Sequence, residues 1–311
     1  MKQRVITALI LLAVFIPIVI FEPLFLVFQF TMILMVIVGS SELINMYNKE
    51  KKMSMIPMVI TVLAAIFIYL SAVISWNNDT SLAYLTPIDI KINFVTITMV
   101  VTLLMFALMV FYKDYDGSDI GKSMTIIFYI GLSVAAVSIL RILGVRFVAY
   151  LFIITMATDI FAYFFGVRFG KHKMIPWISP KKSWEGAIAG TVFATIFGVA
   201  FALFYGYLFP AGSFLNRGGQ MTLLENFSSI GSKALWIQAL VIVPVSFIGS
   251  IVSQIGDLVA SKLKRTYGIK DFGKIFPGHG GILDRFDSAM FVALFLVAVF
   301  MTINQIFPII S

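Results

Sequence analysis

The residues best suited to chemistry lie in one stretch near the C-terminus, between positions 253 and 287. Ser253, Asp257, Ser261 and Lys264 recur at spacings of four, four and three residues, which places them on one face of a helix. That face carries a carboxylate below a cation. We therefore expect this helix to contribute to a site for a charged ligand.

A glycine-rich loop, residues 266–281, follows this helix, and its five glycines allow the backbone to approach a ligand closely. Asp284 and Asp287 then open the next apolar segment and are neighbours on one helical face. Mg²⁺ prefers one or two carboxylates and takes its other ligands from water and substrate phosphates. We predict Asp257 and Asp284 as Mg²⁺ ligands, with Asp287 a third ligand or a partner to Arg285, and whether a second metal ion binds is left open. The alternative is a set of interhelical salt bridges among these residues.

Asp159 is a second candidate because it lies within an apolar segment, roughly 10 Å from the segment's end by helical rise. An ionised group at that depth costs a few kcal/mol, so it marks a functional position by default. The alternative is a packing carboxylate neutralised by Arg168 or a nearby lysine. Asp159, Tyr163, Gly166 and Gly170 share a helix face, which could admit a bulky group.

The loop that follows, residues 170–186, is basic. Its four lysines and Arg168 would attract a triphosphate, and Ser179, Ser183 and backbone amides could donate hydrogen bonds to it. The alternative is ordinary positive charge on a cytoplasmic, proline-containing turn. The spacing of Gly166, Gly170 and the next lysine is too short for a P-loop, so a nucleotide must bind by another route.

Taken together, these stretches resemble the signature of phosphatidate cytidylyltransferases, also called CDP-diacylglycerol synthases. The matching positions are Ser261, Leu263, Lys264, Arg265, Lys270, Asp271, Gly273, Phe276, Pro277, His279, Gly280, Gly281, Ile282, Asp284, Arg285, Phe286 and Asp287. Upstream, Ser179 to Gly186 and the positions Asp159, Ala162, Tyr163 and Gly166 are similar to the family pattern. Ser183 and Trp184 stand where relatives vary.

The resemblance implies that CTP and phosphatidic acid are the substrates, that CDP-diacylglycerol and pyrophosphate are the products, and that magnesium is required. It also implies a bacterial-type plasma membrane enzyme of phospholipid biosynthesis, a homodimer, with its active site facing the cytoplasm. The catalytic candidates are Asp257, Asp284, Lys264 and Arg265. The candidates for binding CTP and phosphate are Asp159, Ser179, Lys181, Lys182, Ser183, Glu185, Ser261, Lys270, Asp271, His279 and Arg285. His279 is either a general base or phosphate donor, or a plain hydrogen-bonding residue.

The composition places these residues in a membrane protein. The chain of 311 residues is 60% apolar and 12% charged, with a mean hydropathy of +1.00, which leaves too little polar surface for a water-soluble globule. The absence of cysteine excludes thiol catalysis and Cys-ligated zinc, and two histidines make a His-rich metal centre improbable. The net charge of +8 suits lipid headgroups, nucleotides and phosphates, and no nucleic-acid partner is expected.

The expected fold is an all-α, polytopic bundle with about nine transmembrane helices. The predicted spans are Val5–Phe21, Pro23–Gly39, Pro57–Trp76, Ile92–Tyr112, Ser123–Leu140, Phe147–Val167, Ala187–Phe209, Ala234–Leu258 and Asp287–Ile309. The N-terminal run superficially resembles a signal peptide but is interpreted as a retained span. An orientation with the N-terminus inside and the C-terminus outside leaves 18 of the 23 Lys and Arg residues on the cytoplasmic side.

We interpret residues 1–311 as a single membrane domain. Its N-terminal spans, 1–140, are nearly uniform apolar helices, and its catalytic half, 147–311, holds cytoplasmic loops at 168–186 and 259–286. Two rival functions remain at this level. One is a CTP-dependent lipid kinase, and the other is a cation-coupled transporter, although transporters often show paired broken helices in both halves.

Overall fold

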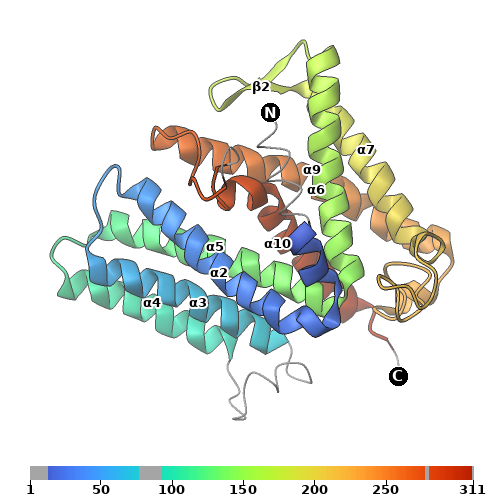
Figure 1. Cartoon of the computed structure of the whole chain (residues 1–311), viewed down its shortest axis with the longest axis horizontal. Coiled ribbons are helices and arrows are strands. Elements are labelled where there is room, and N and C mark those ends of the chain that lie inside the picture. The colour runs from blue at the N-terminus through green and yellow to red at the C-terminus, as the bar shows by residue number, and fades with distance from the viewer. Residues whose placement is uncertain (1–12, 77–92, 277–279, 310–311) are drawn as a thin grey trace. The chain divides into compact units, whose positions relative to one another are not determined.

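The computed structural model describes residues 13–76, 93–276 and 280–309. Figure 1 shows the helices and strands of the chain. The chain forms two compact units. The first contains residues 1–142 and 264–285, and the second contains residues 143–263 and 286–311. The loop after the basic helix end therefore belongs with the N-terminal helices.

Four long helices build the first unit: α2 (Phe25–Tyr47), α3 (Met55–Trp76), α4 (Phe94–Phe111) and α5 (Gly117–Leu143). A short 3-10 helix, η1 (Glu22–Leu24), precedes α2. Helix α3 packs between α2 and α4, and it meets α5 so closely that a Cβ at Gly131 would lie 2.8 Å from the Ala65 carbonyl oxygen. Helix α5 is mostly buried, whereas α4 exposes most of its apolar side chains, as a lipid-facing helix does.

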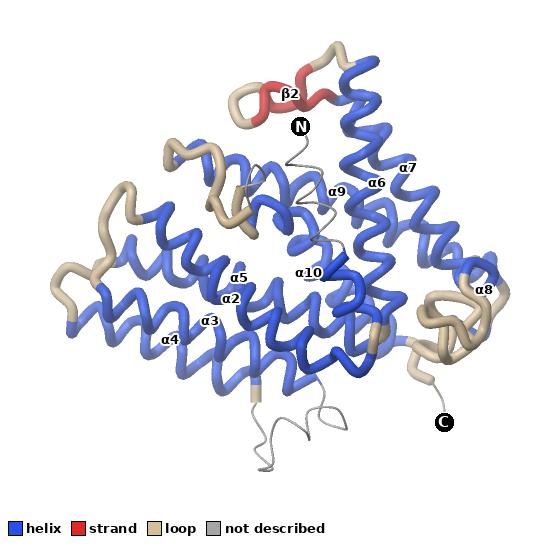
Figure 2. The backbone as a smooth tube through the Cα atoms, in the orientation of Figure 1, coloured by secondary structure: helices blue, strands red, loops and turns tan. Residues whose placement is uncertain are grey.

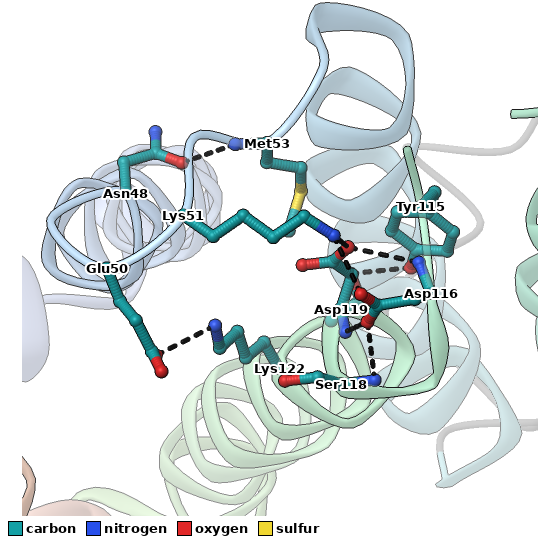
Figure 3. Close-up of polar contacts among 10 residues, drawn as sticks. Asn48, Glu50, Lys51, Met53, Tyr115, Asp116, Ser118, Asp119 and Lys122 are labelled. Atoms are coloured by element: carbon teal, nitrogen blue, oxygen red, sulfur yellow. Dashed lines mark hydrogen bonds and ion pairs between the residues drawn. The ribbon is translucent and has the colours of Figure 1, made fainter. Parts of the chain in front are cut away.

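Ion pairs join two connections of the first unit (Figure 3). The Lys51 ammonium, which follows α2, contacts Asp116 Oδ2 at 2.8 Å and Asp119 Oδ2 at 2.5 Å, and Lys122 contacts Glu50 at 3.0 Å. These hydrogen-bonded ion pairs raise the pKa of Lys51 and lower the pKa of Asp116. The α2–α3 and α4–α5 connections are thereby held together.

The second unit contains α6 (Val145–Phe169), β1 (Lys173–Ile175), β2 (Ser179–Ser183), α7 (Trp184–Leu203), α8 (Tyr205–Leu208), η2 (Ser229–Ser232) and most of α9 (Leu235–Thr266) and α10 (Leu283–Ile306). Strands β1 and β2 pair as an antiparallel hairpin between α6 and α7 (Figure 2). Helices α9 and α10 each cross the boundary between the units.

Small residues and buried hydroxyls hold the helices of the second unit together. A Cβ at Gly190 of α7 would lie 2.7 Å from the Thr158 carbonyl oxygen of α6, so only glycine allows this approach. The Thr158 hydroxyl hydrogen-bonds to Ser250 of α9 at 2.8 Å, and Gln254 donates to Thr191 of α7 at 2.9 Å. Because these bonds replace contacts that lipid cannot supply, they fix α6, α7 and α9 as one body.

The all-α expectation is confirmed in its coarse form, with the β1–β2 hairpin as the exception. Within the described residues, eight helices are long and apolar enough to cross a membrane. Residues 13–20 of the predicted span at 5–21 are helical, and residues 5–12 lie outside the described part of the chain, so the count of nine stays a prediction.

Several boundaries differ from those predicted because a search for apolar runs stops at the first polar residues. Helix α2 continues past Gly39 to Tyr47, α9 continues past Leu258 to Thr266, and α5 and α10 begin earlier, at Gly117 and Leu283. Polar residues are tolerated there because helix ends reach the interface or a protein interior.

Candidate functional site

The second unit brings Asp159, Asp257 and Lys182 together. The Lys182 ammonium of β2 contacts Asp257 Oδ2 at 2.5 Å, and both side chains are about two-thirds buried or more. Asp159 lies close enough to Asp257 and Lys182 to interact electrostatically with both side chains. The structure thus brings together three residues that the sequence assigned to three different segments, and the Lys182 ammonium pairs with Asp257.

Asp287 lies on α10 where that helix meets α9. A Cβ at Gly256, the residue before Asp257, would lie 3.0 Å from the Asp287 carbonyl oxygen, so the two backbones nearly touch. The Asp287 side chain is mostly buried and accepts a hydrogen bond from the Ser288 amide at 2.8 Å.

Ser253, one turn before Asp257, is fully buried, and its hydroxyl has no hydrogen-bond partner within the described residues. Ser261 lies further along the same helix and is half-buried. The continuous helix α9 confirms the predicted helical spacing of these residues.

The basic loop is an ordered hairpin whose base is fastened to α7. Ser183 is buried and accepts a hydrogen bond from the Gly186 amide, which caps the helix. Glu185 accepts from His172 Nδ1 at 2.7 Å and from the His172 amide at 3.1 Å. As placed, Ser183 and Glu185 hold the hairpin in position, and their predicted binding of CTP stays a prediction.

The Gly166–Gly170 face admits the hairpin. A Cβ at Gly170 would come within 2.9 Å of the Ser183 Cβ, and one at Gly166 would lie 3.3 Å from the Ser183 hydroxyl. The bulky group predicted for this face is therefore a segment of the chain itself. Ser179 is half-buried on the hairpin, and Lys181 is exposed.

In the first unit, Asp284 is the centre of a bonded cluster. Its Oδ1 accepts from Lys264 Nζ at 2.7 Å, and its Oδ2 accepts from the Phe272 and Gly281 amides at 2.8 and 2.9 Å. The Asp284 and Lys264 side chains are only 3% and 12% exposed. The Lys264 ammonium also lies 5.0 Å from the centre of the Phe272 ring.

Other cationic candidates surround this cluster on the surface of the first unit. Arg265, Lys270 and Arg285 are exposed, as is Asp271, and Arg265 makes a long contact of 3.5 Å with the Ile269 carbonyl. These side chains are accessible to an anionic ligand. His279 lies outside the described residues, and its role stays a prediction.

Glu42 was missed by the sequence analysis. It is 4% exposed in α2 and accepts hydrogen bonds from the Ile282 amide at 2.9 Å and the Leu283 amide at 3.0 Å. The predicted span ends at Gly39, and Glu42 falls outside it. A carboxylate one turn past an apolar run is a signal that could have identified it.

The donor set fits a hard divalent cation only in part. Asp159 and Asp257 supply two neighbouring carboxylates, which matches the number that Mg²⁺ usually takes from a protein. Asp284 accepts two hydrogen bonds at Oδ2 and one at Oδ1, so a metal at Oδ1 would either share that oxygen with the Lys264 ammonium or replace it. Within the described residues, no three Asp, Glu, His or Cys side chains form a metal-binding group.

A model of the cytidylyltransferase family matches residues 2–303, almost the whole chain. The chain belongs to the cytidylyltransferase family. It is similar to proteins named phosphatidate cytidylyltransferase from Staphylococcus saprophyticus, with 33% identity over 294 residues, and Staphylococcus haemolyticus, with 32% identity over 294 residues. It is 34% identical over 293 residues to the protein of that name from Staphylococcus aureus strain COL. Each alignment covers 94% of this chain and 96% of the relative.

Family membership confirms the resemblance found in the signature residues. In this cytidylyltransferase-family chain, the signature supplies two ion pairs, Lys182–Asp257 in the second unit and Lys264–Asp284 in the first. Of these pairs, Lys264–Asp284 joins two helices and is a salt bridge of the kind expected as the alternative to a metal site. The two ion pairs do not exclude substrate binding, because a phosphate can compete with a carboxylate for the same lysine.

Proposed function

We propose that this chain is a phosphatidate cytidylyltransferase that converts CTP and phosphatidic acid to CDP-diacylglycerol and pyrophosphate. The observation that carries the proposal is that each unit pairs a lysine of the family signature with a carboxylate of that signature, Lys182 with Asp257 and Lys264 with Asp284. Names of relatives that cover nearly the full chain support the same activity.

The reaction needs no nucleophile from the protein. A phosphate oxygen of phosphatidic acid attacks the α-phosphorus of CTP, a new P–O–P bond forms, and the bond to the departing pyrophosphate breaks. The protein must position two anions that repel each other and neutralise the charge that develops on the leaving group. Lys182 and Lys264 are suited to this because each is held in place by a carboxylate.

We further propose that the enzyme requires Mg²⁺, with Asp257 and Asp284 as ligands and Asp287 as a third ligand or a partner to Arg285. When bound, the ion would neutralise charge on the β- and γ-phosphates. Asp159 and Asp257 supply negative charge that such an ion needs, and Lys182 pairs with Asp257.

The location of the chain follows from its helices. Eight helices long and apolar enough to span a bilayer support an integral membrane protein. We propose the bacterial plasma membrane, a cytoplasm-facing site and a homodimer. The boundary between the membrane and the cytoplasm suits this site because CTP is soluble in water and phosphatidic acid remains in the bilayer.

Turnover of labelled CTP by the purified protein in mixed micelles tests the activity. Lipid-linked CMP and pyrophosphate should appear only when both phosphatidic acid and magnesium are present. Release of CDP with phosphorylation of an added lipid alcohol would instead indicate the kinase. No nucleotide chemistry under any condition would contradict both enzymes.

A further inference from the structure

Glu42 joins helix α2 to the start of α10, across 240 positions of sequence. Its Oε1 accepts from the Ile282 amide and its Oε2 from the Leu283 amide, at 2.9 and 3.0 Å. Both carboxylate oxygens are therefore used, and the side chain is buried. An ionised or neutral carboxyl group held this far from water must serve a specific partner.

The fit around this carboxylate is close. A Cβ built at either Gly273 or Gly281 would collide with the Glu42 carboxylate. The glycines of the loop thus make room for a side chain of the protein, in addition to any ligand. The sequence had assigned them only to the approach of a ligand.

The two amides that Glu42 accepts from are ones that α10 cannot satisfy itself. The first N–H groups of a helix have no intrahelical acceptor, and they carry partial positive charge. Leu283 is the first residue of α10 and Ile282 precedes it. Glu42 therefore caps α10 from a distant helix, while Asp284 Oδ2 accepts from the neighbouring Gly281 amide.

The next residue in the chain is Asp284, which holds Lys264. Its position depends on the backbone of residues 281–283, and Glu42 fixes that backbone. We propose that Glu42 is a positioning residue that sets the Asp284–Lys264 pair for the transfer reaction, acting through the start of α10 and without touching substrate. The proposal rests on the proposed function only where turnover is concerned.

The variant Glu42→Gln removes one of the two acceptor oxygens of Glu42 while it keeps the volume of the side chain. Glutamine has nearly the same shape, but its amide nitrogen donates and cannot accept, so one of the two backbone N–H groups loses its partner. Glu42→Asp keeps the charge but is one methylene shorter, which prevents it from reaching both amides. We expect both variants to loosen the start of α10, and neither to restore wild-type behaviour.

Two measurements on the full-length protein in detergent test the proposal. Amide hydrogen exchange of the peptide that contains residues 280–283 should be at least about tenfold faster in Glu42→Gln, because a buried amide is left unpaired. The kcat should fall by about tenfold or more, with the KM for phosphatidic acid within about twofold of wild type, because the positioning acts on the transition state.

Gln29→Leu is the matched control, since Gln29 is also a buried polar residue of α2 and bonds to Tyr69, away from the loop. It should leave exchange at 280–283 and kcat unchanged. Wild-type exchange in Glu42→Gln, wild-type kcat despite faster exchange, or an equal effect in Gln29→Leu would each overturn the proposal. If the wild-type protein forms no CTP-dependent lipid product, the proposed function fails, and the exchange comparison still decides whether Glu42 anchors α10.

Discussion

At the scale of single residues, Asp284 carries two roles that mutation can separate. It was predicted as a metal ligand, and in the structure it accepts from Lys264 and from two backbone amides. The two backbone amides use both acceptor sites of Oδ2, whereas Oδ1 accepts from Lys264 alone. A metal ion could replace the Lys264 ammonium at Asp284 Oδ1, whereas a phosphate could replace Asp284 as the partner of Lys264.

We expect Asp284→Asn to lower kcat by about a hundredfold, because the amide nitrogen would face the Lys264 ammonium or a backbone donor. Turnover should be measured over a range of magnesium concentrations. A higher magnesium requirement, with turnover still below wild type at saturating magnesium, would favour the ligand role. A deficit of the same size at every magnesium concentration would favour the anchoring role. Normal turnover at saturating magnesium would contradict both. Asp114→Asn, at an exposed aspartate of the α4–α5 connection, is the control for loss of one charge.

Lys182 and Lys181 offer a second comparison at this scale. They are neighbours on β2, but Lys182 is held by Asp257 at 2.5 Å, whereas Lys181 is exposed. A positioned charge contributes more to a transition state than a mobile one.

We therefore expect Lys182→Met to lower kcat/KM for CTP by about tenfold or more, and Lys181→Met to lower it by about threefold at most. Steady-state kinetics with varied CTP at fixed phosphatidic acid would measure both. Equal losses would mean that the hairpin acts only by its total charge.

At the scale of elements, the contact between α6 and α7 determines where Asp159 lies. Gly190 is packed against the Thr158 carbonyl oxygen, one residue before Asp159. A methyl group there would push the helices apart, and overpacking of this kind typically costs 1–3 kcal/mol.

We expect Gly190→Ala to reduce the free energy of unfolding by about 1–3 kcal/mol and to lower turnover as well. Gly121→Ala is the matched control because a Cβ there has no neighbour within 4 Å. That change should leave stability unchanged or raise it by up to about 1 kcal/mol, since alanine favours a helix. Thermal unfolding in detergent would compare them, and a neutral Gly190→Ala would contradict the close contact.

The pairing of the α2–α3 and α4–α5 connections depends on Lys51. Asp116 has a lowered pKa in the folded protein, so its contribution to stability is present above its unfolded value of about 3.9 and is lost as the pH falls through the lower folded value. The raised pKa of Lys51 means that its contribution persists up to strongly alkaline pH.

We expect Lys51→Met to lower the unfolding temperature by a few degrees at pH 7, and this deficit should shrink as the pH falls below about 4. Lys52→Met is the control, since the neighbouring Lys52 is exposed and makes no ion pair within the described residues. A deficit that stays constant through the acid range would show that the ion pair with Asp116 is not its cause.

The elements also show which parts of the site the sequence could reveal. The face of Asp257 and Lys264 was predictable because helical spacing is local and α9 is continuous. The Glu42 contact was not, because its partners lie 240 residues away and no local pattern connects them. The sequence analysis did not predict the β1–β2 hairpin because its strands have only three and five residues, too few to show the alternation of apolar and polar side chains that marks a strand. Strand β2 also contains a proline, which is rare inside a sheet.

At the scale of the whole molecule, the remaining question is how the chain is threaded through the bilayer. The described helices support eight spans, and the predicted orientation rests on the distribution of Lys and Arg. If residues 5–21 also span the bilayer, the N-terminus lies on the cytoplasmic side; if they do not, it lies outside. The predicted side of the membrane on which each later loop lies is the same in both cases. Loop positions therefore test the orientation, and the N-terminus tests the span count.

The chain contains no cysteine, so single introduced thiols report their own location. In intact cells, a membrane-impermeant maleimide should label Arg217→Cys, in the exposed connection after α8, and should label Ser118→Cys only after permeabilisation. The reverse pattern would invert the topology and place the hairpin of Lys182 on the outer side, away from CTP. Gln3→Cys then distinguishes eight spans from nine. A thiol at position 3 that the maleimide does not label in intact cells requires nine spans, whereas labelling from outside requires eight.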